Sequence, residues 1–233
     1  MGQILNFKKS ILSTEWKKKY DDLMYRFHEL YEDCDKCLEE GYKLYGGALE
    51  LIDVEPLYIV KIVHLIGIIR TERIIETGEK DLDVIYFIKN HRYLIQDEYR
   101  KRHSEWLEAK SLSLNDDKYL NSAIHIYMDL LKYFKDIINQ SKNEAEFIKQ
   151  NQNYACMKME LADIYRRKKN KILSKKYAAE SINIYMELFL NNNIGKNELK
   201  DYYNRFKNIS ELNNNYDEIN RIDEILVSNE IAL

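Results

Sequence analysis

The residues of clearest chemical meaning in this chain are arginines carried by helix-forming sequence. Arg166 and Arg167 end the segment Ala162-Asp163-Ile164-Tyr165-Arg166-Arg167, and Arg70 follows the apolar run 65–69. A guanidinium presents planar, paired donors that match the oxygens of a phosphate. An arginine on an apolar helix must either reach solvent or find an anionic partner. These residues therefore predict an anion-binding surface, with ordinary solvent-exposed arginines as the alternative.

Sequence signatures of the common enzyme classes do not occur in this chain. No glycine-rich phosphate loop follows a strand pattern, and there is neither a nucleophile elbow nor an HExxH motif. The five histidines are scattered, and carboxylate pairs such as Glu39-Glu40 stand in solvated contexts without a catalytic partner. The sequence thus predicts a protein that is not an enzyme and that carries no metal site and no cofactor.

The three cysteines are interpreted as ordinary thiols. Cys34 and Cys37 form a CxxC pair, but no second pair completes a zinc site, and no strand precedes them as in a thioredoxin-like motif. Two thiols at helical spacing are the simpler interpretation. The third, Cys156, makes the count odd, and no secretory leader pattern opens the chain. This usage fits a reducing compartment, so we expect a cytoplasmic protein.

Composition indicates a helical globular protein. The 233 residues are 45% hydrophobic and 32% charged, and a single proline and seven glycines leave few turn formers for a β fold. The formal charge of −3 gives no overall basic field for nucleic acid, so any basic cluster has to be judged locally. The most apolar run, 57–69, contains Lys61 and His64 and is shorter than the ~20 residues that span a bilayer. We expect no nucleic-acid partner and no membrane.

Apolar residues recur three or four positions apart along nearly the whole chain, as amphipathic helices require. The pattern predicts nine helices, over residues 13–33, 35–51, 56–77, 81–112, 118–140, 144–169, 171–190, 197–212 and 217–227. The chain is expected to break at Gly46-Gly47, 77–78, 115–117, 191–195 and 213–215. Short connections favour antiparallel neighbours, so the expectation is one all-α domain, 1–233, built as an antiparallel bundle or solenoid of helical hairpins. A tetratricopeptide-like pair can be drawn from Leu161 to Ser181, although no fixed repeat length stands out.

Several segments resemble those of 14-3-3 proteins, in the same order along the chain. Residues 162–167 resemble the family's Gly-Asp-Tyr-Tyr-Arg-Tyr segment, which grips a phosphate, and 54–70 resembles its third helix, with Arg70 on a phosphate-binding arginine. Tyr203-Asn204 and 210–213 resemble Leu-Asn-Phe-Ser through Tyr-Glu-Ile-Leu-Asn. The resemblance implies that Asn204 holds the main chain of a bound peptide and that Glu211 belongs to the same groove. It gives Asp163 the role of orienting the arginines.

The resemblance also implies a homodimer. Residues 18–23, Lys-Lys-Tyr-Asp-Asp-Leu, resemble the Arg-Tyr-Asp-Asp-Met of the family's first helix, and 97–102 resembles the Arg-Glu-Tyr-Arg-Glu-Lys of its fourth. By this resemblance Asp22 pairs with Arg102 across a two-fold interface to which Lys19 and Tyr99 also contribute. Helices within about 10–50 would then form the dimer, and 54–233 would form the groove.

Some positions depart from the family's pattern. Val63 and Ile74 stand where the family has a lysine and a further arginine of the phosphate pocket, and Arg167 replaces a tyrosine that bonds the phosphate. The chain ends after what would be the eighth helix, without a counterpart of the ninth. The pocket is therefore expected to be atypical and partly depleted.

The leading expectation is a non-catalytic 14-3-3-type adaptor in signal transduction that binds phosphoserine or phosphothreonine peptides as a homodimer. An alternative is a helical-hairpin scaffold, tetratricopeptide-like, that binds partner proteins without phosphate. A third is a helical enzyme or ligand-binding regulator whose site carries no recognised motif.

Overall fold

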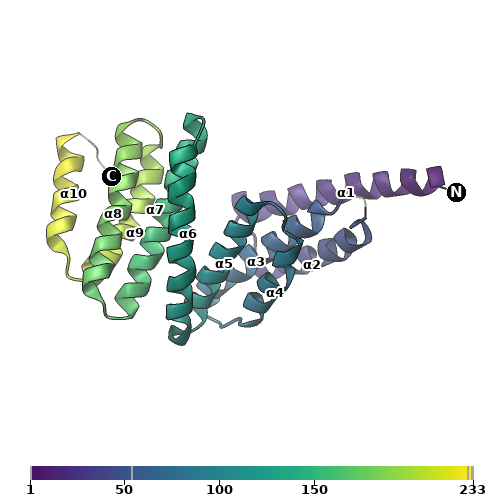
Figure 1. Cartoon of the computed structure of the whole chain (residues 1–233), viewed down its shortest axis with the longest axis horizontal. Coiled ribbons are helices and arrows are strands. Elements are labelled where there is room, and N and C mark those ends of the chain that lie inside the picture. Colours follow the sequence, from purple (N-terminus) through teal and green to yellow (C-terminus); the bar gives the residue numbers. More distant parts are fainter. Residues whose placement is uncertain (1, 54, 230, 232–233) are drawn as a thin grey trace. The chain divides into compact units, whose positions relative to one another are not determined.

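The computed structural model describes residues 2–53, 55–229 and 231, with side chains from residue 10 onward, and within these ranges no strand occurs. The all-α expectation is confirmed, and residue 54, which opens one of the 14-3-3-like segments, lies outside the described residues (Figure 1). The helices are α1 (Gly2–Glu29), α2 (Cys34–Glu50), α3 (Leu57–Thr77), α4 (Asp83–His91), α5 (Glu98–Asn115), α6 (Leu120–Gln140), α7 (Glu144–Arg167), α8 (Lys171–Leu190), α9 (Lys196–Leu212) and α10 (Tyr216–Ser228), with 3-10 turns at Arg92–Leu94 and Asp117–Tyr119.

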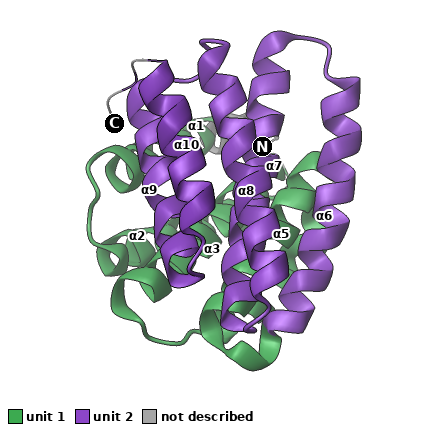
Figure 2. Cartoon of the chain, turned by 90° about the vertical axis from the view of Figure 1, so that its left-hand side faces the viewer, with its two compact units in different colours: residues 1–119 green, residues 120–233 purple. Residues whose placement is uncertain are grey.

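The helices form two compact units, residues 1–119 and 120–233, coloured separately in Figure 2. In unit 1, α2 packs against α1 and α3, and α3 also packs against α4 and α5. In unit 2, α6 to α10 pack in chain order, and α7 also contacts α9. Each unit has its own hydrophobic core, built from the apolar stripes of its helices.

The single helix expected over 81–112 is wrong, because the chain turns between α4 and α5. Asp97 begins α5, and its side chain accepts a hydrogen bond from the backbone N–H of Arg100 at 2.8 Å. Such a cap favours a helix start at this position. The intervening 3-10 turn carries Arg92, which donates to the buried carboxylate of Glu108 in α5. The turn between α4 and α5 therefore supplies the cation that the buried Glu108 carboxylate needs. No glycine or proline in 92–97 indicates this turn in the sequence.

The break expected at Gly46-Gly47 is also wrong, because α2 continues to Glu50. A Cβ atom on Gly47 would lie 3.2 Å from Cδ1 of Trp16 in α1, closer than most side-chain contacts. The Trp16 indole N–H donates to the Leu44 carbonyl at 2.7 Å, and its ring stacks on Tyr58 at 4.1 Å. Gly47 therefore allows α1 and α2 to approach closely. By contrast, Gly78 ends α3 as expected, with a left-handed φ of 69°.

The three connections from α7 to α10 share one geometry, which the α6–α7 connection at 141–143 does not have. Lys169, Asn192 and Asn214, which are 23 and 22 positions apart, each follow a helix with a φ of 54° to 60°. In each case the next residue donates its N–H back across the turn, to the carbonyls of Tyr165, Leu188 and Ser210, at 2.8–2.9 Å. These bonds satisfy carbonyls that the helix end leaves open. The turns that join α7 to α10 therefore recur at a nearly constant spacing, which the apolar pattern does not reveal.

The helices α7 and α8 make the closest contact in unit 2, through small residues. Ser174 and Ser181 of α8 donate their hydroxyl groups to the carbonyls of Ala162 and Ala155 in α7, at 2.7 and 2.6 Å. All four residues are buried, together with Ala178. Small side chains let two helices approach until hydroxyl groups reach the neighbouring backbone. This is the hairpin that the sequence suggests as tetratricopeptide-like.

The left-handed turns should respond to substitution according to residue type. Asn tolerates this conformation better than Lys or Ala, because its short polar side chain bonds locally. We expect Lys169→Asn to raise the free energy of unfolding slightly and Asn214→Ala to lower it by about 1 kcal/mol. Urea unfolding would measure both. Lys168→Asn, at an ordinary φ of −75°, is the matched control, and an equal gain from it would contradict the explanation.

Candidate functional site

Arg70 of unit 1 binds a carboxylate of its own chain. Its Nε donates to Oδ2 of Asp81 at 2.6 Å, and its Nη2 donates to Oδ1 of the same group. Nη1 donates to the Tyr42 hydroxyl at 3.3 Å, and the guanidinium lies over the Phe87 ring. The Arg70 side chain is only 13% exposed. The anionic partner that an arginine on this apolar helix requires is therefore Asp81.

The carboxylate that Arg70 holds is fixed in place by further bonds. Asp81 donates its N–H to Oδ1 of Asn115 at 2.6 Å, and the Asn115 amide donates back to the Asp81 carbonyl at 3.1 Å. Asp81 Oδ1 also accepts from the N–H of Val84 in the first turn of α4, at 3.2 Å. The pair therefore joins α3, α4 and α5. An external phosphate would have to displace Asp81 to reach the Arg70 guanidinium.

The two positions where the sequence departs from the 14-3-3 pattern in α3 belong to the protein interior. Val63 and Ile74 are both buried. Arg73, the other basic residue of this helix near Arg70, donates to Asp35 of α2 at 2.7 Å and lies 3.1 Å from Glu79. Around Arg70, therefore, α3 presents apolar packing and internally paired charge.

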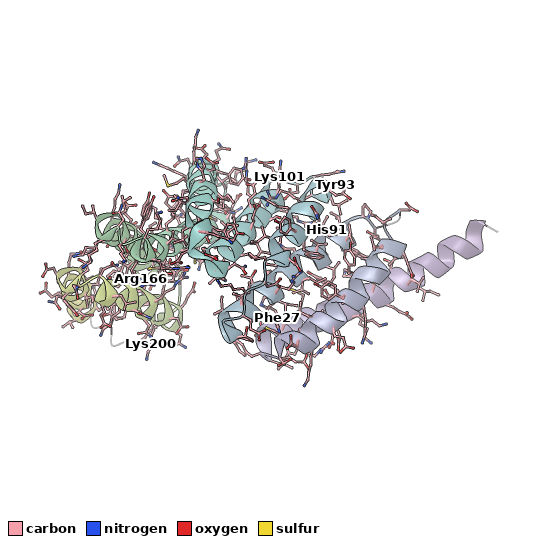
Figure 3. The ribbon with its side chains drawn as sticks, turned by 90° about the horizontal axis from the view of Figure 1, so that it is seen from below. Phe27, His91, Tyr93, Lys101, Arg166 and Lys200 are labelled. Carbon is pink, nitrogen blue, oxygen red and sulfur yellow. The ribbon has the colours of Figure 1, made fainter. Side chains whose placement is uncertain are left out.

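Arg166 lies in the last turn of α7, in unit 2, and pairs with Asp163 one turn earlier (Figure 3). Its Nε and Nη2 are 2.9 and 2.8 Å from the same oxygen, Asp163 Oδ1. The Arg166 side chain is 29% exposed, so one edge of the guanidinium can reach solvent. Arg167 follows it and is half-buried. Arginines suit this position, because a helix C-terminus attracts positive charge.

Two contacts between α7 and α9 set the register of the remaining site residues. Gln152 donates to Glu198 at 2.6 Å, and Arg205 Nη2 lies 3.9 Å from Glu160, so the two helices run parallel with an offset of about 45 residues. The same offset places Glu211 beside the last turn of α7. Asn204 lies two helical turns earlier on α9, and both residues are exposed.

The structure thus distributes the predicted phosphate site over the two units. Asp163, Arg166 and Arg167 on α7 and Asn204 and Glu211 on α9 belong to unit 2, where the two helices are in contact. Arg70 belongs to unit 1.

Sequence reasoning missed Glu160, the residue that joins three helices of unit 2. The Tyr127 hydroxyl of α6 donates to its Oε2, and Arg205 of α9 approaches its Oε1. Glu160 shares a face of α7 with Asp163 and Arg167, three and seven positions later. In the sequence, only this spacing links Glu160 to the predicted site, because its partners Tyr127 and Arg205 stand 33 and 45 positions away.

The residues assigned to a dimer interface lie in α1 and α5 of unit 1. Asp22 is 2.9 Å from Arg26, which also binds Glu32 and Glu40. Arg102 lies 2.8 Å from both Glu98 and Glu105, and Tyr99 packs on the His103 ring at 4.5 Å. Lys19 is exposed and lines a cavity of about 130 Å³ beside Trp16. Asp22 and Arg102 therefore each have partners within one chain.

The CxxC thiols lie in the first turn of α2, as helical spacing predicts, and both are buried. Burial, reinforced by the neighbouring Glu76, raises the pKa of Cys34 to about 12. Burial also raises the pKa of Cys37, to about 11. Within the described residues, no group of three or more His, Cys, Asp or Glu side chains is placed to hold a metal ion. Nor does any described helix combine the length and apolar character needed to cross a bilayer.

Comparisons with known proteins give no relative. No family model, no curated protein and no solved structure matches this chain. The likeness to 14-3-3 proteins therefore rests on the short segments named from the sequence.

Removing the Asp81 charge should destabilise unit 1. The variant Asp81→Asn leaves the Arg70 guanidinium poorly exposed with a weaker partner, so we expect a loss of about 2–3 kcal/mol in the free energy of unfolding. Asp22→Asn, which alters an exposed pair, is the control and should cost less than about 0.5 kcal/mol. Urea unfolding followed by circular dichroism would measure both, and equal losses would show that the Arg70 pair has no special role.

The three thiols should react slowly in the folded protein. Burial raises the pKa of Cys34, Cys37 and Cys156, so the reactive thiolate is scarce near pH 8 and increases only as the pH rises toward those values. We expect a thiol reagent at pH 8 to modify them at least tenfold more slowly than in urea-unfolded protein. Rapid modification of one cysteine in the native state would contradict this expectation.

Proposed function

We propose that this protein is a non-catalytic scaffold that binds segments of other proteins on the helical hairpins of unit 2. The observation that carries the proposal is the series of hairpins from α7 to α10, joined by turns of one geometry. Arrays of this kind bind partners along rows of side chains contributed by every second helix. In unit 2, α7 and α9 supply one such row, and a contact between Tyr177 of α8 and Met128 of α6, at 3.4 Å, marks the other.

The row formed by α7 and α9 has the chemistry to hold a polypeptide. Asn204 is exposed, and an amide side chain can both donate to and accept from an extended main chain. Asp163, Arg166 and Glu211 lie toward one end of the row and offer both signs of charge to partner side chains. The three cysteines are free thiols, which suits a cytoplasmic location.

A second candidate is binding of phosphoserine or phosphothreonine peptides, as in a 14-3-3-type adaptor. It is favoured by the partial exposure of Arg166, whose pairing is limited to one turn of its own helix. Arg166 and Arg167 would take the phosphate, at about 1.5–3 kcal/mol per charged hydrogen bond, and Asn204 would hold the peptide main chain. Arg70 would first have to release Asp81. A homodimer formed through Lys19, Asp22, Tyr99 and Arg102 would double the number of sites.

Matched peptide libraries can separate the two candidates. Degenerate peptides with a central phosphoserine, and the same peptides with serine, would first be enriched for binding to the full chain. The affinity of each enriched sequence would then be measured by fluorescence anisotropy. The scaffold predicts similar affinity for both forms and at least a tenfold loss in Asn204→Ala/Glu211→Ala. The phosphopeptide hypothesis predicts at least a tenfold preference for the phosphorylated form, and it predicts that Arg166→Ala abolishes this preference.

The control for both is Lys132→Ala, which removes an exposed charge from α6, a helix outside the α7–α9 row. The row assignment is wrong if Lys132→Ala weakens binding as much as Asn204→Ala/Glu211→Ala does. The scaffold itself is wrong if neither library yields a bound sequence.

A further inference from the structure

The strongest local charge of the chain lies at the turn between α7 and α8. Seven of the eleven residues from 166 to 176 are basic and none is acidic, although the chain as a whole has a formal charge of −3. They are Arg166, Arg167, Lys168, Lys169, Lys171, Lys175 and Lys176. Five of the seven are lysines, which carry compact, hydrated charges on flexible stems. This composition differs from the bidentate arginine fork that suits one phosphate.

Three chain segments meet at this end of unit 2. Lys168 donates to the Asn121 side chain in the first turns of α6 at 2.7 Å. Lys175 donates to the Asn214 carbonyl at 3.4 Å, and the Asn213 amide donates to the Ser174 hydroxyl at 2.7 Å. The turns α7–α8 and α9–α10 therefore lie together, at the lower end of unit 2 in Figure 1.

Large apolar side chains project into solvent at the same end. Ile172, between Lys171 and Lys175, is 82% exposed, and Leu212 and Tyr216 of the adjacent turn are 57% and 56% exposed. Exposed aliphatic side chains contribute little to stability in water. Lysines in the same turns as protruding Ile, Leu and Tyr side chains suit the boundary between lipid headgroups and acyl chains.

We propose that this end of unit 2, the residues 166–176 with Leu212 and Tyr216, docks on an anionic membrane surface. The lysines meet the lipid headgroups, and Ile172 enters the apolar boundary beneath them. The sequence led us to expect no membrane partner, because its most apolar segment is too short to span a bilayer. Surface docking requires neither a basic net charge nor a spanning helix.

Acidic groups at this end reduce the local charge without cancelling it. Asp163 pairs with Arg166, and Glu180 lies 3.9 Å from Lys176. Glu211 and Asp217 flank the neighbouring turn. With Glu218 beside Asp217, these are five carboxylates against seven cationic groups, so the end stays positive.

Vesicle co-sedimentation of the full chain tests the proposal. We expect binding to vesicles of phosphatidylcholine with phosphatidylserine, little binding to phosphatidylcholine alone, and weakening by salt. Each lysine near an anionic surface contributes about fivefold, so Lys169→Asn/Lys171→Gln should weaken binding roughly 30-fold. Lys132→Gln/Lys135→Gln, on the exposed side of α6, makes the same change of charge away from this end and should bind nearly as the wild type.

The apolar contribution is tested by Ile172→Ser, which leaves the charge unchanged and should weaken vesicle binding about tenfold. Circular dichroism would confirm that each variant folds. Absence of binding, or equal binding to neutral vesicles, overturns the proposal. So does a result in which polyglutamate binds with the same salt dependence and Ile172→Ser has no effect, because the end would then bind polyanions, such as acidic protein segments, in general.

Discussion

A charged group that leaves water needs an opposite charge, and this constraint decides which charges of the chain remain available to partners. Arg70 satisfies this constraint by pairing with Asp81, and Arg92 satisfies it by pairing with Glu108. In unit 2, Glu160 accepts a hydrogen bond from the Tyr127 hydroxyl and lies near Arg205, and these contacts join three helices. The pairs that hold helices together are the buried ones. Cations that solvent reaches remain available to outside partners, and the densest group of them lies at the turn between α7 and α8.

The two units therefore use charge differently. In unit 1, Arg70 is part of the framework that fixes α3, α4 and α5. In unit 2, small residues and tight turns supply much of the packing, and Glu160 with Arg205 links α7 to α9. The hairpin row and the basic end adjoin at Arg166. Asn204 belongs to the row alone and Ile172 to the basic end alone, so each surface can be altered without changing the other.

Helical periodicity predicted most helices and the ends at residues 77–78, 115–117, 191–195 and 213–215. It failed at Gly47, because glycine can mark either a turn or a close approach, and only the position of Trp16 decides which. It failed at 92–97 because Arg92 in this turn pairs with Glu108, which lies 16 positions away in the sequence. For the site, the sequence showed that Arg70 required an anion. It did not identify Asp81 as the anionic partner, because the position of Asp81 depends on the path of the chain after Gly78.

The turns from α7 to α10 have a consequence for which changes in chain length the unit can accept. Each of these three reversals is made by one left-handed residue and closed by a backbone bond to the preceding helix. Each turn therefore fixes where one helix ends and the next begins. A residue inserted or deleted within one of these helices would shift the register of its side chains against both neighbouring helices, although the turn itself would keep its geometry.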